Sequence, residues 1–506
     1  MTSPKIELSS SATGPNYKVG WWTSKLAGPI IVAAAIRFTL LAITLARNGT
    51  STLIQGDSLS YLSPGRNLIL HGSFVADGAP DLLRTPGYPL FLAVTTLAGP
   101  PFAAVVNVIL SVFSVLLVWR LGRAAFDDPR VALGAAWLLA LEPGSVTWSV
   151  VLLSDTLFVV LYLLSLERFA HFLRFNRLPV LVMAGLLLAA AIFVRPVAYY
   201  LPLALALWLL LAASRAPDDS PQPQKSIARK LLLRSKAPAV LLITVVPWLA
   251  AWQIRNWIEA DYSGFSSVAE INLYYNDAAN LTAEAEHRNY SEVRDELGRL
   301  CWVDCNQQTY LYQPYLTRNP KQAGWSQGQR LAFMHTQAVS VIRAHLWLYS
   351  RSCLTSLAWV MFDPGTRAFD ALIDPGKTAH FIDVLKDKGF LNGTIEFVRT
   401  NPRPAIEKVA FESLLLCMYL LAARGIFHFG GHDLRPWLLL GTTLYFLGIV
   451  GATTGGPGVD ARYRLPVMPI LCILAAAEFW RTKVSRAKSI TPPPDADLDR
   501  LTIESD

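Results

Sequence analysis

The chain has 506 residues, of which 53% are hydrophobic and 16% are charged, and its formal net charge is +8. This composition, with many apolar runs of membrane length, excludes a soluble globular protein and indicates a polytopic membrane protein. Its 15 Trp and 17 Tyr residues suit the aromatic belts of membrane interfaces. The basic residues gather in short clusters beside apolar runs, so we interpret them as topology signals and expect no nucleic-acid partner.

The N-terminal residues 1–25 are polar, and we expect them to form a disordered cytoplasmic segment. The apolar run 26–46 is too long for the core of a typical signal peptide and is followed directly by charge, so we interpret it as an uncleaved first span. Arg37 lies in the middle of this run, where a charge is costly. We expect it to belong to a structural ion pair.

Ten apolar segments have about the 20 residues that a helix needs to cross a bilayer core. They are 26–46, 101–121, 131–149, 152–172, 178–195, 197–213, 237–254, 407–424, 436–452 and 465–481. Basic residues cluster after the second, fourth, sixth and tenth segments, and the positive-inside rule makes these ends cytoplasmic. The loops 47–100, 255–406 and 453–464, with the short turns at 150–151 and 196, then lie on the outer face.

This topology divides the chain into five parts. They are the N-terminus 1–25, a transmembrane catalytic module 26–254 with its first outer loop 47–100, an extracytoplasmic loop region 255–406, C-terminal transmembrane helices 407–481 and a disordered cytoplasmic tail 482–506. The segment 338–361 would invert everything after it if it spanned the membrane, so we interpret it as a juxtamembrane helix. Cys301 and Cys305 lie in the outer region, where a disulfide could persist, and a bridged and an unbridged pair both stay open.

Asp57 lies just outside the first span, at the water boundary. Ser60 and Tyr61 follow it at helical spacing and Gly72 is a stop signal, so we expect a short helix on the membrane over 57–71, with the three side chains on one face. An acid in this position is suited to interfacial chemistry. The alternative is that Asp57 only caps the N-terminus of this helix.

Two further acids lie at the outer ends of spans. Asp155 begins the fourth span, where it is either a functional acid or a helix cap, and Glu142 ends the third beside Pro143, where we expect a structural pairing. Acids so close to hydrocarbon are costly unless they are paired or wetted. Two outer acids near one cleft, Asp57 and Asp155, could also hold a divalent cation.

Arginines gather on the outer face, against the positive-inside bias of the rest of the chain. Arg84 precedes Thr85 and Pro86, which favours a stiff turn with the guanidinium projecting from it. The others are Arg195, Arg255, Arg462 and Arg464. Because the guanidinium fork matches phosphate oxygens, the set indicates a bound anion. The alternative is scattered snorkelling to lipid headgroups.

A substrate with a phosphate headgroup and a long lipid tail would need arginines around the anion, apolar helices around the tail and a carboxylate beside the reacting carbon. If the reaction is glycosyl transfer from a lipid phosphate, arginines stabilise the leaving phosphate and a carboxylate takes the proton of the acceptor hydroxyl. A single displacement of this kind inverts the anomeric carbon. The chain has no Walker loop, Rossmann fingerprint or serine elbow.

With these motifs in order, the chain resembles the GT-C glycosyltransferases, in particular bacterial relatives of the dolichyl-phosphate-mannose protein mannosyltransferases and of the lipid A aminoarabinose transferase. The resemblance is carried by Gly56 and Asp57 with Tyr61, by Arg84 to Pro89, by Ser154 and Asp155, by Arg195 and Pro196, by Trp252 to Asn256 and by Arg462 to Pro466. It implies an all-α polytopic membrane protein, with a GT-C-like bundle of about ten transmembrane helices, extracytoplasmic loops and juxtamembrane helices.

The resemblance also implies site residues. The catalytic acid falls on Asp57 and the second acid on Asp155, while Arg84, Arg195, Arg255, Arg462 and Arg464 would bind the donor phosphate. Ser60, Tyr61, Tyr88 and Tyr463 would position donor and acceptor. Ser58 follows Asp57 where the family often has a second acid, so the division of roles between the two acids and the presence of a divalent cation stay open.

The function predicted from the sequence is a hexosyl- or pentosyltransferase of the cell (inner) membrane, with an extracytoplasmic active site. It would move a sugar from a polyprenyl-phosphate donor to a protein, lipid or glycan acceptor, by an inverting single displacement among membrane lipids. The alternative is a lipid-linked sugar binder or flippase without transferase activity.

Overall fold

The computed structural model describes residues 19–54, 57–215, 227–298, 311–374, 390–427, 434–453 and 460–490. Gly56 and the pair Cys301 and Cys305 lie outside the described residues, as do most of the two expected tails. The first helix begins at Val19 and the last ends at Ile490, so both continue past the ends that their apolar runs predict.

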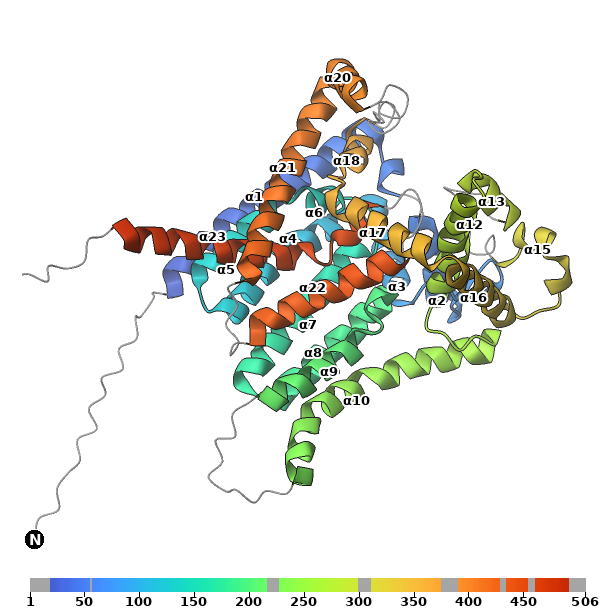
Figure 1. Ribbon diagram of the computed structural model, residues 1–506, viewed down its shortest axis with the longest axis horizontal. Helices are drawn as coiled ribbons and strands as arrows, with labels where there is room; N and C mark the ends of the chain where they lie inside the picture. Colours follow the sequence, from blue (N-terminus) through green and yellow to red (C-terminus); the bar gives the residue numbers. More distant parts are fainter. Residues whose placement is uncertain are drawn as a thin grey trace, which may run out of the picture.

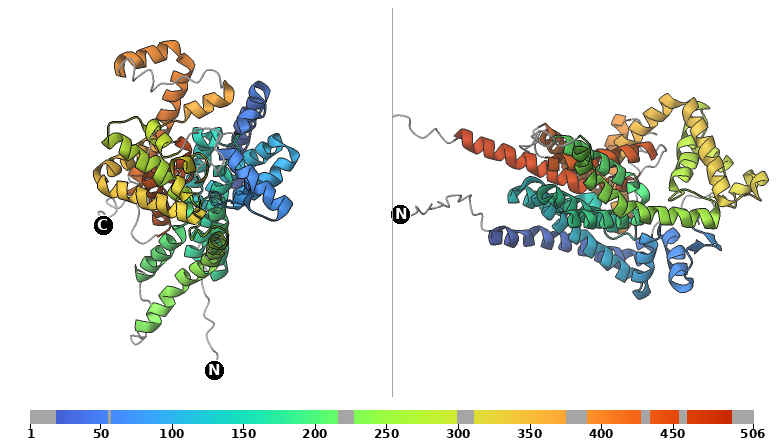
Figure 2. Two further views of the ribbon diagram at one scale, coloured as in Figure 1. Left: turned by 90° about the vertical axis from the view of Figure 1, so that its right-hand side faces the viewer. Right: turned by 90° about the horizontal axis from the view of Figure 1, so that it is seen from below.

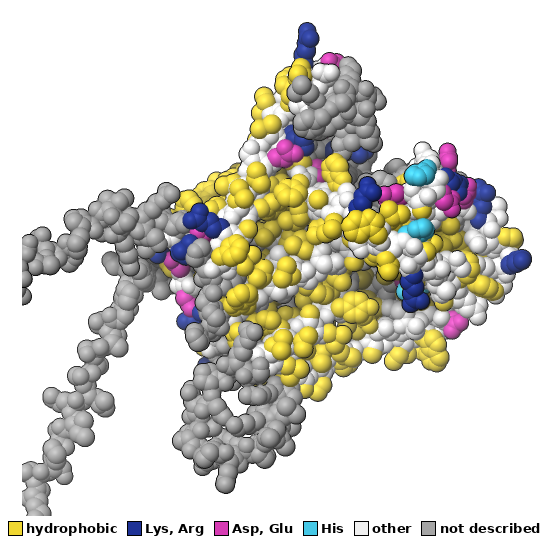
Figure 3. Space-filling view, viewed as in Figure 1, with side chains coloured by type: hydrophobic (Ala, Val, Ile, Leu, Met, Phe, Trp, Pro, Cys, Tyr) yellow, Lys and Arg dark blue, Asp and Glu magenta, His cyan; other side chains and the backbone are white. Residues whose placement is uncertain are grey.

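Every predicted apolar run is largely helical, although the run 131–149 is divided between two helices, and this confirms the all-helical membrane fold. The long helices are α1 (Val19–Asn48), α4 (Pro100–Phe126), α5 (Pro129–Leu141), α7 (Asp155–Phe175), α8 (Leu178–Val194), α9 (Leu201–Arg215), α10 (Ile227–Ala260), α21 (Pro402–Ile426), α22 (Leu434–Thr453) and α23 (Met468–Ile490). In the described part of the chain, six helices are long and apolar enough to cross a membrane, and shorter apolar helices lie beside them. Figure 3 shows hydrophobic side chains over the middle of the molecule and charged ones toward its two ends.

The loops between these helices form short elements. The first outer loop holds η1 (Ser51–Leu53), α2 (Asp57–His71), the hairpin β1 (Val75–Ala76) and β2 (Ala79–Pro80), α3 (Gly87–Thr95) and η2 (Thr96–Ala98). Further along come α6 (Pro143–Thr147), η3 (Pro196–Ala198), α11 (Val268–Asn272), η4 (Leu273–Ala278), α12 (Ala279–Ala285), α13 (Tyr290–Glu296), α15 (Tyr315–Arg318), η5 (Pro320–Gln322), α16 (Gln327–Ala344), α17 (Leu346–Phe362), α18 (Thr366–Ile373), α20 (Phe390–Thr400) and η7 (Ala461–Arg464).

Different loops lie at the two ends of the bundle. At one end, where α1 begins and α23 ends (Figure 1), Asp127 forms ion pairs with Arg174 and Arg435, the latter at 2.8 Å. At the other end the first and second outer loops meet, because the Leu152 N–H donates to the Leu53 carbonyl at 2.9 Å. Figure 2 shows α16 and α17 at this second end, far from the start of α1. We call it the site end.

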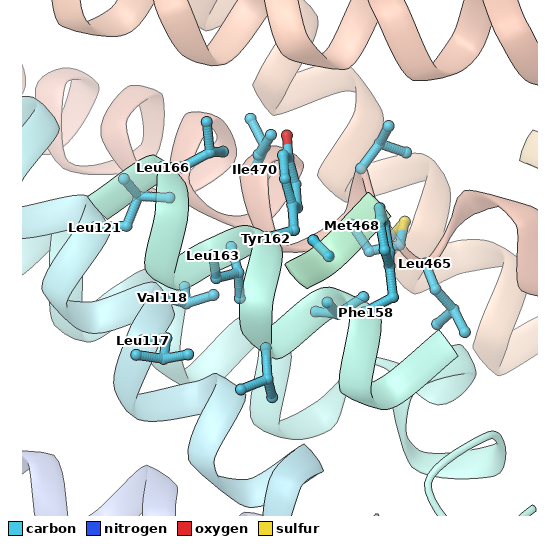
Figure 4. Close-up of a cluster of buried hydrophobic side chains, with 14 of the residues drawn as sticks. Leu117, Val118, Leu121, Phe158, Tyr162, Leu163, Leu166, Leu465, Met468 and Ile470 are labelled. Carbon is cyan, nitrogen blue, oxygen red and sulfur yellow. The ribbon is translucent and has the colours of Figure 1, made fainter. Parts of the chain in front are cut away.

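The main core lies between α4, α7 and α23. Figure 4 shows Phe158 and Tyr162 of α7 among leucines of α4 and the first residues of α23. Tyr162 also packs edge-on against Phe446 of α22, with ring centroids 5.0 Å apart. A second, separate core joins Leu82 and Leu83 to buried residues between Ala260 and Ala338. The segment 260–338 thus has apolar packing of its own.

The predicted third span, 131–149, is broken into α5 and α6. The Glu142 carboxylate caps α6 by accepting from the N–H groups of Gly144, at 2.9 Å, and Ser145. Arg37 is fully buried and donates to the Leu139 and Ala140 carbonyls, at 3.2 and 3.0 Å, which end α5. Its hydrogen-bond acceptors are neutral oxygens rather than the carboxylate that we expected, and a helix C-terminus suits a cation.

The predicted juxtamembrane segment is broken at His345 into α16 and α17. Both ends of α17 stay at the site end of the bundle. The Tyr349 hydroxyl donates to the Ala452 carbonyl of α22 at 2.8 Å, and Arg464 donates to the Val360 carbonyl at 3.1 Å. α17 therefore does not run from one end of the bundle to the other.

The predicted helix over 57–71 is α2, and it ends at Gly72, whose φ of +69° a glycine adopts without strain. Gly65 lets α2 lie directly against α3, because a Cβ at this position would be 2.2 Å from the Pro89 carbonyl oxygen. The backbones themselves therefore fix the place of α2.

Candidate active site

A cavity of about 480 Å³ opens at the site end of the bundle. Its walls come from the start of α2, the turn at Arg84, the facing ends of α7 and α8, the end of α10, the segment from α11 to α13, and η7. Of the residues predicted from sequence, seven line it: Asp57, Tyr61, Arg84, Asp155, Arg195, Arg462 and Tyr463. Segments far apart in the chain thus bring most of the expected site together.

Asp57 lies between two arginines. One carboxylate oxygen accepts from Arg84 Nη2 and the other from Arg462 Nη2, each at 2.7 Å. The Asp57 side chain is 35% exposed, whereas those of Arg84 and Arg462 are 13% and 16% exposed. The carboxylate bridges the two guanidinium groups. Asp57 therefore does more than cap the N-terminus of α2.

The pKa of Asp57 follows from this arrangement. Burial alone would raise the pKa, but the charges and hydrogen bonds of Arg84 and Arg462 outweigh it and hold the pKa well below its usual range. Asp57 is therefore ionised at neutral pH. As long as both arginines bind it, however, it is a weak base.

Arg84 is held on three sides by α2. Its Nε donates to the Ser60 hydroxyl at 2.9 Å and its Nη1 to the Tyr61 hydroxyl at 3.1 Å. The guanidinium also lies over the Tyr61 ring, 4.2 Å from its centroid. Ser60 and Tyr61 therefore orient Arg84, and they can do so because the helical spacing puts them on the same face as Asp57.

Asp155 and Arg195 form a second acid–arginine pair. Arg195 Nη1 donates to Asp155 Oδ1, and the two side chains are 16% and 4% exposed respectively. Arg195 ends α8 in an extended conformation before Pro196, while Asp155 is the first residue of α7. The neighbouring Ser154 hydroxyl lies 3.2 Å from the Tyr61 hydroxyl, which links this pair to α2.

The loops that carry the two acids are bonded to each other. The Ser58 hydroxyl donates to the Leu152 carbonyl at 2.8 Å, and Asn107 Nδ2 donates to the Ser149 and Val151 carbonyls, both at 2.9 Å. Both Ser58 and Asn107 are buried. The relative placement of the two acids is therefore set by backbone carbonyls and buried polar side chains.

Arg255 and Arg464, which we expected to bind the donor phosphate, are directed elsewhere. Arg255 donates to the Phe74 and Asp81 carbonyls, at 2.6 and 3.1 Å, and so supports the β1–β2 hairpin. Arg464 is buried, and donates to the Val360 carbonyl at 3.1 Å and to the Asp363 carbonyl. Neither lines the cavity.

The remaining predicted positions, Ser60 and Tyr88, also stay outside the cavity wall. The Ser60 hydroxyl accepts a hydrogen bond from Arg84 Nε. Tyr88 is fully buried and packs edge-on against Tyr61, with ring centroids 4.8 Å apart. Ser60 thus contacts Arg84, and Tyr88 contacts Tyr61.

Asp81 was missed by sequence reasoning. Its side chain is buried, and its Oδ1 accepts from the Arg84 N–H at 2.8 Å, which fixes the turn that presents the guanidinium. Burial raises the pKa of Asp81 to about 7 in spite of the nearby Arg84 charge. The signal in the sequence was an Asp three residues before Arg84, because Asp side chains accept from backbone N–H groups two or three residues on at turns and helix caps.

The far wall of the cavity, formed by α10 to α13, was also missed, because the polar stretch after residue 258 contains no motif that we recognise. Glu270 accepts from the Tyr262 hydroxyl at 2.9 Å. Asn276 Nδ2 donates to Asn272 Oδ1 at 3.1 Å. All four residues line the cavity.

The residues that we expected to hold a divalent cation do not fit one in this arrangement. Both oxygens of Asp57 and Oδ1 of Asp155 bond guanidinium groups, which place positive charge where a cation would have to bind. Among the described residues, no group of three or more His, Cys, Asp or Glu side chains could hold a metal ion.

Known proteins resemble the chain in part. Residues 84–250 match the family model described as dolichyl-phosphate-mannose-protein mannosyltransferase. No curated protein matches the chain. The solved oligosaccharyltransferase of Archaeoglobus fulgidus in the apo form is 14% identical, with 94% of this chain and 52% of that chain covered and a TM-score of 0.47.

Two further solved structures match over most of the chain. AglB from Archaeoglobus fulgidus, in complex with an inhibitory peptide and a dolichol-phosphate, is 12% identical, with 94% of this chain and 52% of that chain covered and a TM-score of 0.48. ArnT from Cupriavidus metallidurans bound to undecaprenyl phosphate is 14% identical, with 94% and 82% covered and a TM-score of 0.34.

The chain spans about half the length of the oligosaccharyltransferases that it matches. The match over residues 84–250 begins at Arg84 and includes Asp155 and Arg195. It agrees with the resemblance inferred from the motifs over this third of the chain: residues 84–250 are similar to the dolichyl-phosphate-mannose-protein mannosyltransferase family.

Proposed function

We propose that the chain transfers a sugar from a polyprenyl-phosphate donor to an acceptor, by a single displacement that inverts the anomeric carbon. The observation that carries this proposal is the bridge of Asp57 between Arg84 and Arg462 at the wall of the cavity. A carboxylate and two guanidinium groups are the base and the anion site that this reaction requires.

The donor phosphate would bind Arg84 and Arg462, with Arg195 nearby in the same cavity. Arginine forks bind phosphate oxygens bidentately, and Ser60 and Tyr61 already hold Arg84 in one orientation. The phosphate would compete with Asp57 for the guanidinium groups. As their hold on Asp57 weakens, its pKa rises toward the ordinary value and it becomes a better base. Donor binding would thus activate the carboxylate.

In the transfer step, the acceptor hydroxyl oxygen attacks the anomeric carbon from the face opposite the phosphate. A new carbon–oxygen bond forms, the bond between that carbon and the phosphate oxygen breaks, and the hydroxyl proton passes to Asp57. The electron pair of the broken bond stays on the polyprenyl phosphate, whose charge the arginines stabilise. Asp155, bonded to Arg195, is the rival for the role of base.

We propose that the site end faces the extracytoplasmic side of the inner membrane. The basic clusters around Arg120, Arg174 and Arg435 lie at the opposite end, and the positive-inside rule makes that end cytoplasmic. The acceptor would then be an extracytoplasmic protein, lipid or glycan.

The test is to give the purified protein a panel of polyprenyl-phosphate hexoses and pentoses, with protein, lipid and glycan acceptors, and to compare wild type with Asp57→Asn and Asp155→Asn. We expect transfer by the wild type and a loss of about 10²–10⁴-fold in Asp57→Asn, the usual contribution of a general base. The anomeric configuration of the product reports inversion or retention.

Other outcomes would contradict parts of the proposal. Turnover that survives in Asp57→Asn but is lost in Asp155→Asn would assign the base to Asp155. A retained anomeric configuration would exclude the single displacement. Binding of lipid-linked sugars by the wild type without any transfer would favour the sugar binder or flippase.

A further inference from the structure

The cavity has two chemically different walls. One carries Asp57, Arg84, Arg195 and Arg462, whereas the opposite wall, from α10 to α13, carries a carboxylate, amides, tyrosines and the buried Arg294. We call this opposite wall the amide wall and define it by Tyr262, Glu270, Asn272, Asn276 and Tyr290. The displacement proposed above gives no role to any of them.

The amide wall is attached to the segment that presents Arg84. The Ser267 N–H donates to the Leu82 carbonyl at 2.8 Å, and the Ser266 hydroxyl donates to the Leu83 carbonyl at 2.7 Å. Leu83 directly precedes Arg84. A sugar attached to a phosphate at Arg84 therefore lies beside this wall. An acceptor that attacks this sugar lies beside it as well.

The polar groups of the wall are built into the fold. The Tyr262 ring is buried and its hydroxyl donates to Glu270 Oε2 at 2.9 Å. Gly264 makes room for this tyrosine, because a Cβ there would lie 2.1 Å from the hydroxyl oxygen. Glu270 is thus fixed by a buried donor, and burial raises its pKa.

A departure from regular helix geometry occurs in the middle of the wall. The chain runs from α11 through the π-helical turn η4 into α12, with Asn272 ahead of the turn and Asn276 within it. Single π-turns inside helices are uncommon and occur frequently at functional sites. Here the two asparagines are joined by a hydrogen bond of 3.1 Å and both line the cavity.

We propose that the amide wall is a subsite for a sugar ring and determines which sugar the cavity accepts. A carboxylate accepts from hydroxyls, an amide both donates and accepts, and tyrosine offers an apolar ring face with a polar tip, so the set matches a hydroxyl-rich ring. A ligand hydroxyl bonded to Glu270 would discriminate strongly, because a buried polar group left unpaired is costly. The inference rests on the proposed function, since it names the substrate class of the same cavity.

The ring could belong to the donor or to an acceptor glycan, and binding measurements distinguish the two. The probes are bare undecaprenyl phosphate, undecaprenyl phosphate carrying a hexose, and a methyl hexoside. Affinities are measured by thermophoresis in detergent for wild type, Glu270→Gln and Asn272→Ala. Glu292→Gln is the matched control, because it is an exposed glutamate of α13 that does not line the cavity.

If the ring belongs to the donor, wild type binds the sugar-bearing lipid more tightly than the bare lipid, and Glu270→Gln loses about tenfold of affinity for the former only. A lost hydrogen bond to a charged group has this size. If it belongs to an acceptor, the methyl hexoside binds together with the sugar-bearing lipid, and Glu270→Gln weakens that binding about tenfold.

The inference is overturned if Glu270→Gln and Asn272→Ala bind both the sugar-bearing lipid and the methyl hexoside as tightly as the wild type does. It is also overturned if their binding of bare undecaprenyl phosphate weakens as much as their binding of the sugar-bearing lipid. Because the readout is binding, it separates this inference from the proposed function. A wild type that binds the sugar through Glu270 but never transfers it would contradict the transferase and leave the sugar subsite standing.

Discussion

The carboxylate of Asp57 and the guanidinium of Arg462 lie 2.7 Å apart although 405 positions separate them in the chain. This contact joins the start of α2 to the turn that leads into α23. Since Arg84 bonds the other oxygen of the same carboxylate, an anion that binds between these arginines must compete with Asp57.

Asp57→Asn should therefore bind bare polyprenyl phosphate more tightly than wild type does, even though it no longer transfers sugar. The amide keeps the size of the side chain but removes the negative charge that competes with phosphate for Arg84 and Arg462. Equilibrium binding of undecaprenyl phosphate measures this. Asp77→Asn, an exposed residue of the same loop, should leave the affinity unchanged. Weaker binding by Asp57→Asn would contradict the competition.

Arg462→Gln and Arg464→Gln should have different effects despite their closeness in sequence. Arg462 lines the cavity, so its loss should weaken lipid-phosphate binding about tenfold or more while thermal stability changes little. Arg464 is buried and bonds the end of α17, so its loss should lower the melting temperature by several degrees. Scanning fluorimetry and lipid binding separate the two. Equal effects on both measurements would show that the arginines act as one cluster.

Tyr61→Phe should reduce turnover by about tenfold or more without unfolding the protein, the size of a lost hydrogen bond to a charged group. The variant keeps the ring beneath the Arg84 guanidinium but loses the hydroxyl that Arg84 Nη1 and Ser154 contact. Tyr61→Ala should cost more, because the ring contact is lost as well. An unchanged rate in Tyr61→Phe would show that the Tyr61 hydroxyl is not needed to orient Arg84.

Asp81→Asn should change the pH dependence of stability. The pKa of about 7 in the folded protein exceeds the value of about 4 for an unfolded Asp. Between these values the folded form binds more protons than the unfolded form, so the free energy of unfolding of the wild type falls as pH rises from about 4 to 7. The amide does not titrate. The melting temperature of Asp81→Asn should therefore rise relative to that of the wild type between about pH 4 and pH 7. Above pH 7 the difference should stay constant.

A matched variant identifies the source of that shift. Asp77→Asn removes a carboxyl from the exposed part of the same hairpin, and the change of the melting-temperature difference with pH should be larger for Asp81→Asn than for this variant. If the difference for Asp81→Asn changes no more than that for Asp77→Asn, the Asp81 carboxyl titrates normally and the burial argument is wrong.

Gly65→Ala should destabilise the protein by about 1–3 kcal/mol, the usual cost of overpacking. The added methyl would meet the Pro89 carbonyl at 2.2 Å, so α2 would have to move away from α3 and carry Asp57 with it. Gly324→Ala is the control, because its Cβ meets nothing within 4 Å. Melting temperature and turnover should both fall in Gly65→Ala. Neither should fall in Gly324→Ala.

The helices could be predicted from the sequence because their signals are local. The spacing of Asp57, Ser60 and Tyr61 and the stop at Gly72 predicted α2, and the structure has it over Asp57–His71. The third span was different: the run 131–149 contains Glu142 and Pro143, and the capping contacts of Glu142 show why the helix breaks there. A hydropathy pattern does not report which backbone N–H groups a carboxylate reaches.

The motifs named several residues that the cavity brings together, Arg462 among them, but they do not state which way each side chain points. Gln253 and Arg255 differ by two positions, about 200° around a helix, so only one can face the cavity. The cavity takes Gln253, while Arg255 supports the hairpin. The motif contains both residues and does not state which one faces inward.

The separate apolar packing of the segment 260–338 has a consequence for how such proteins diversify. Asp155 and Arg195 lie at the ends of α7 and α8, whereas the amide wall belongs to a segment whose apolar packing is separate from the main core. New side chains at positions such as 270 and 276 can therefore be accepted without repacking the bundle. Substitutions in this segment can thus alter one wall of the cavity while Asp155 and Arg195 keep their places.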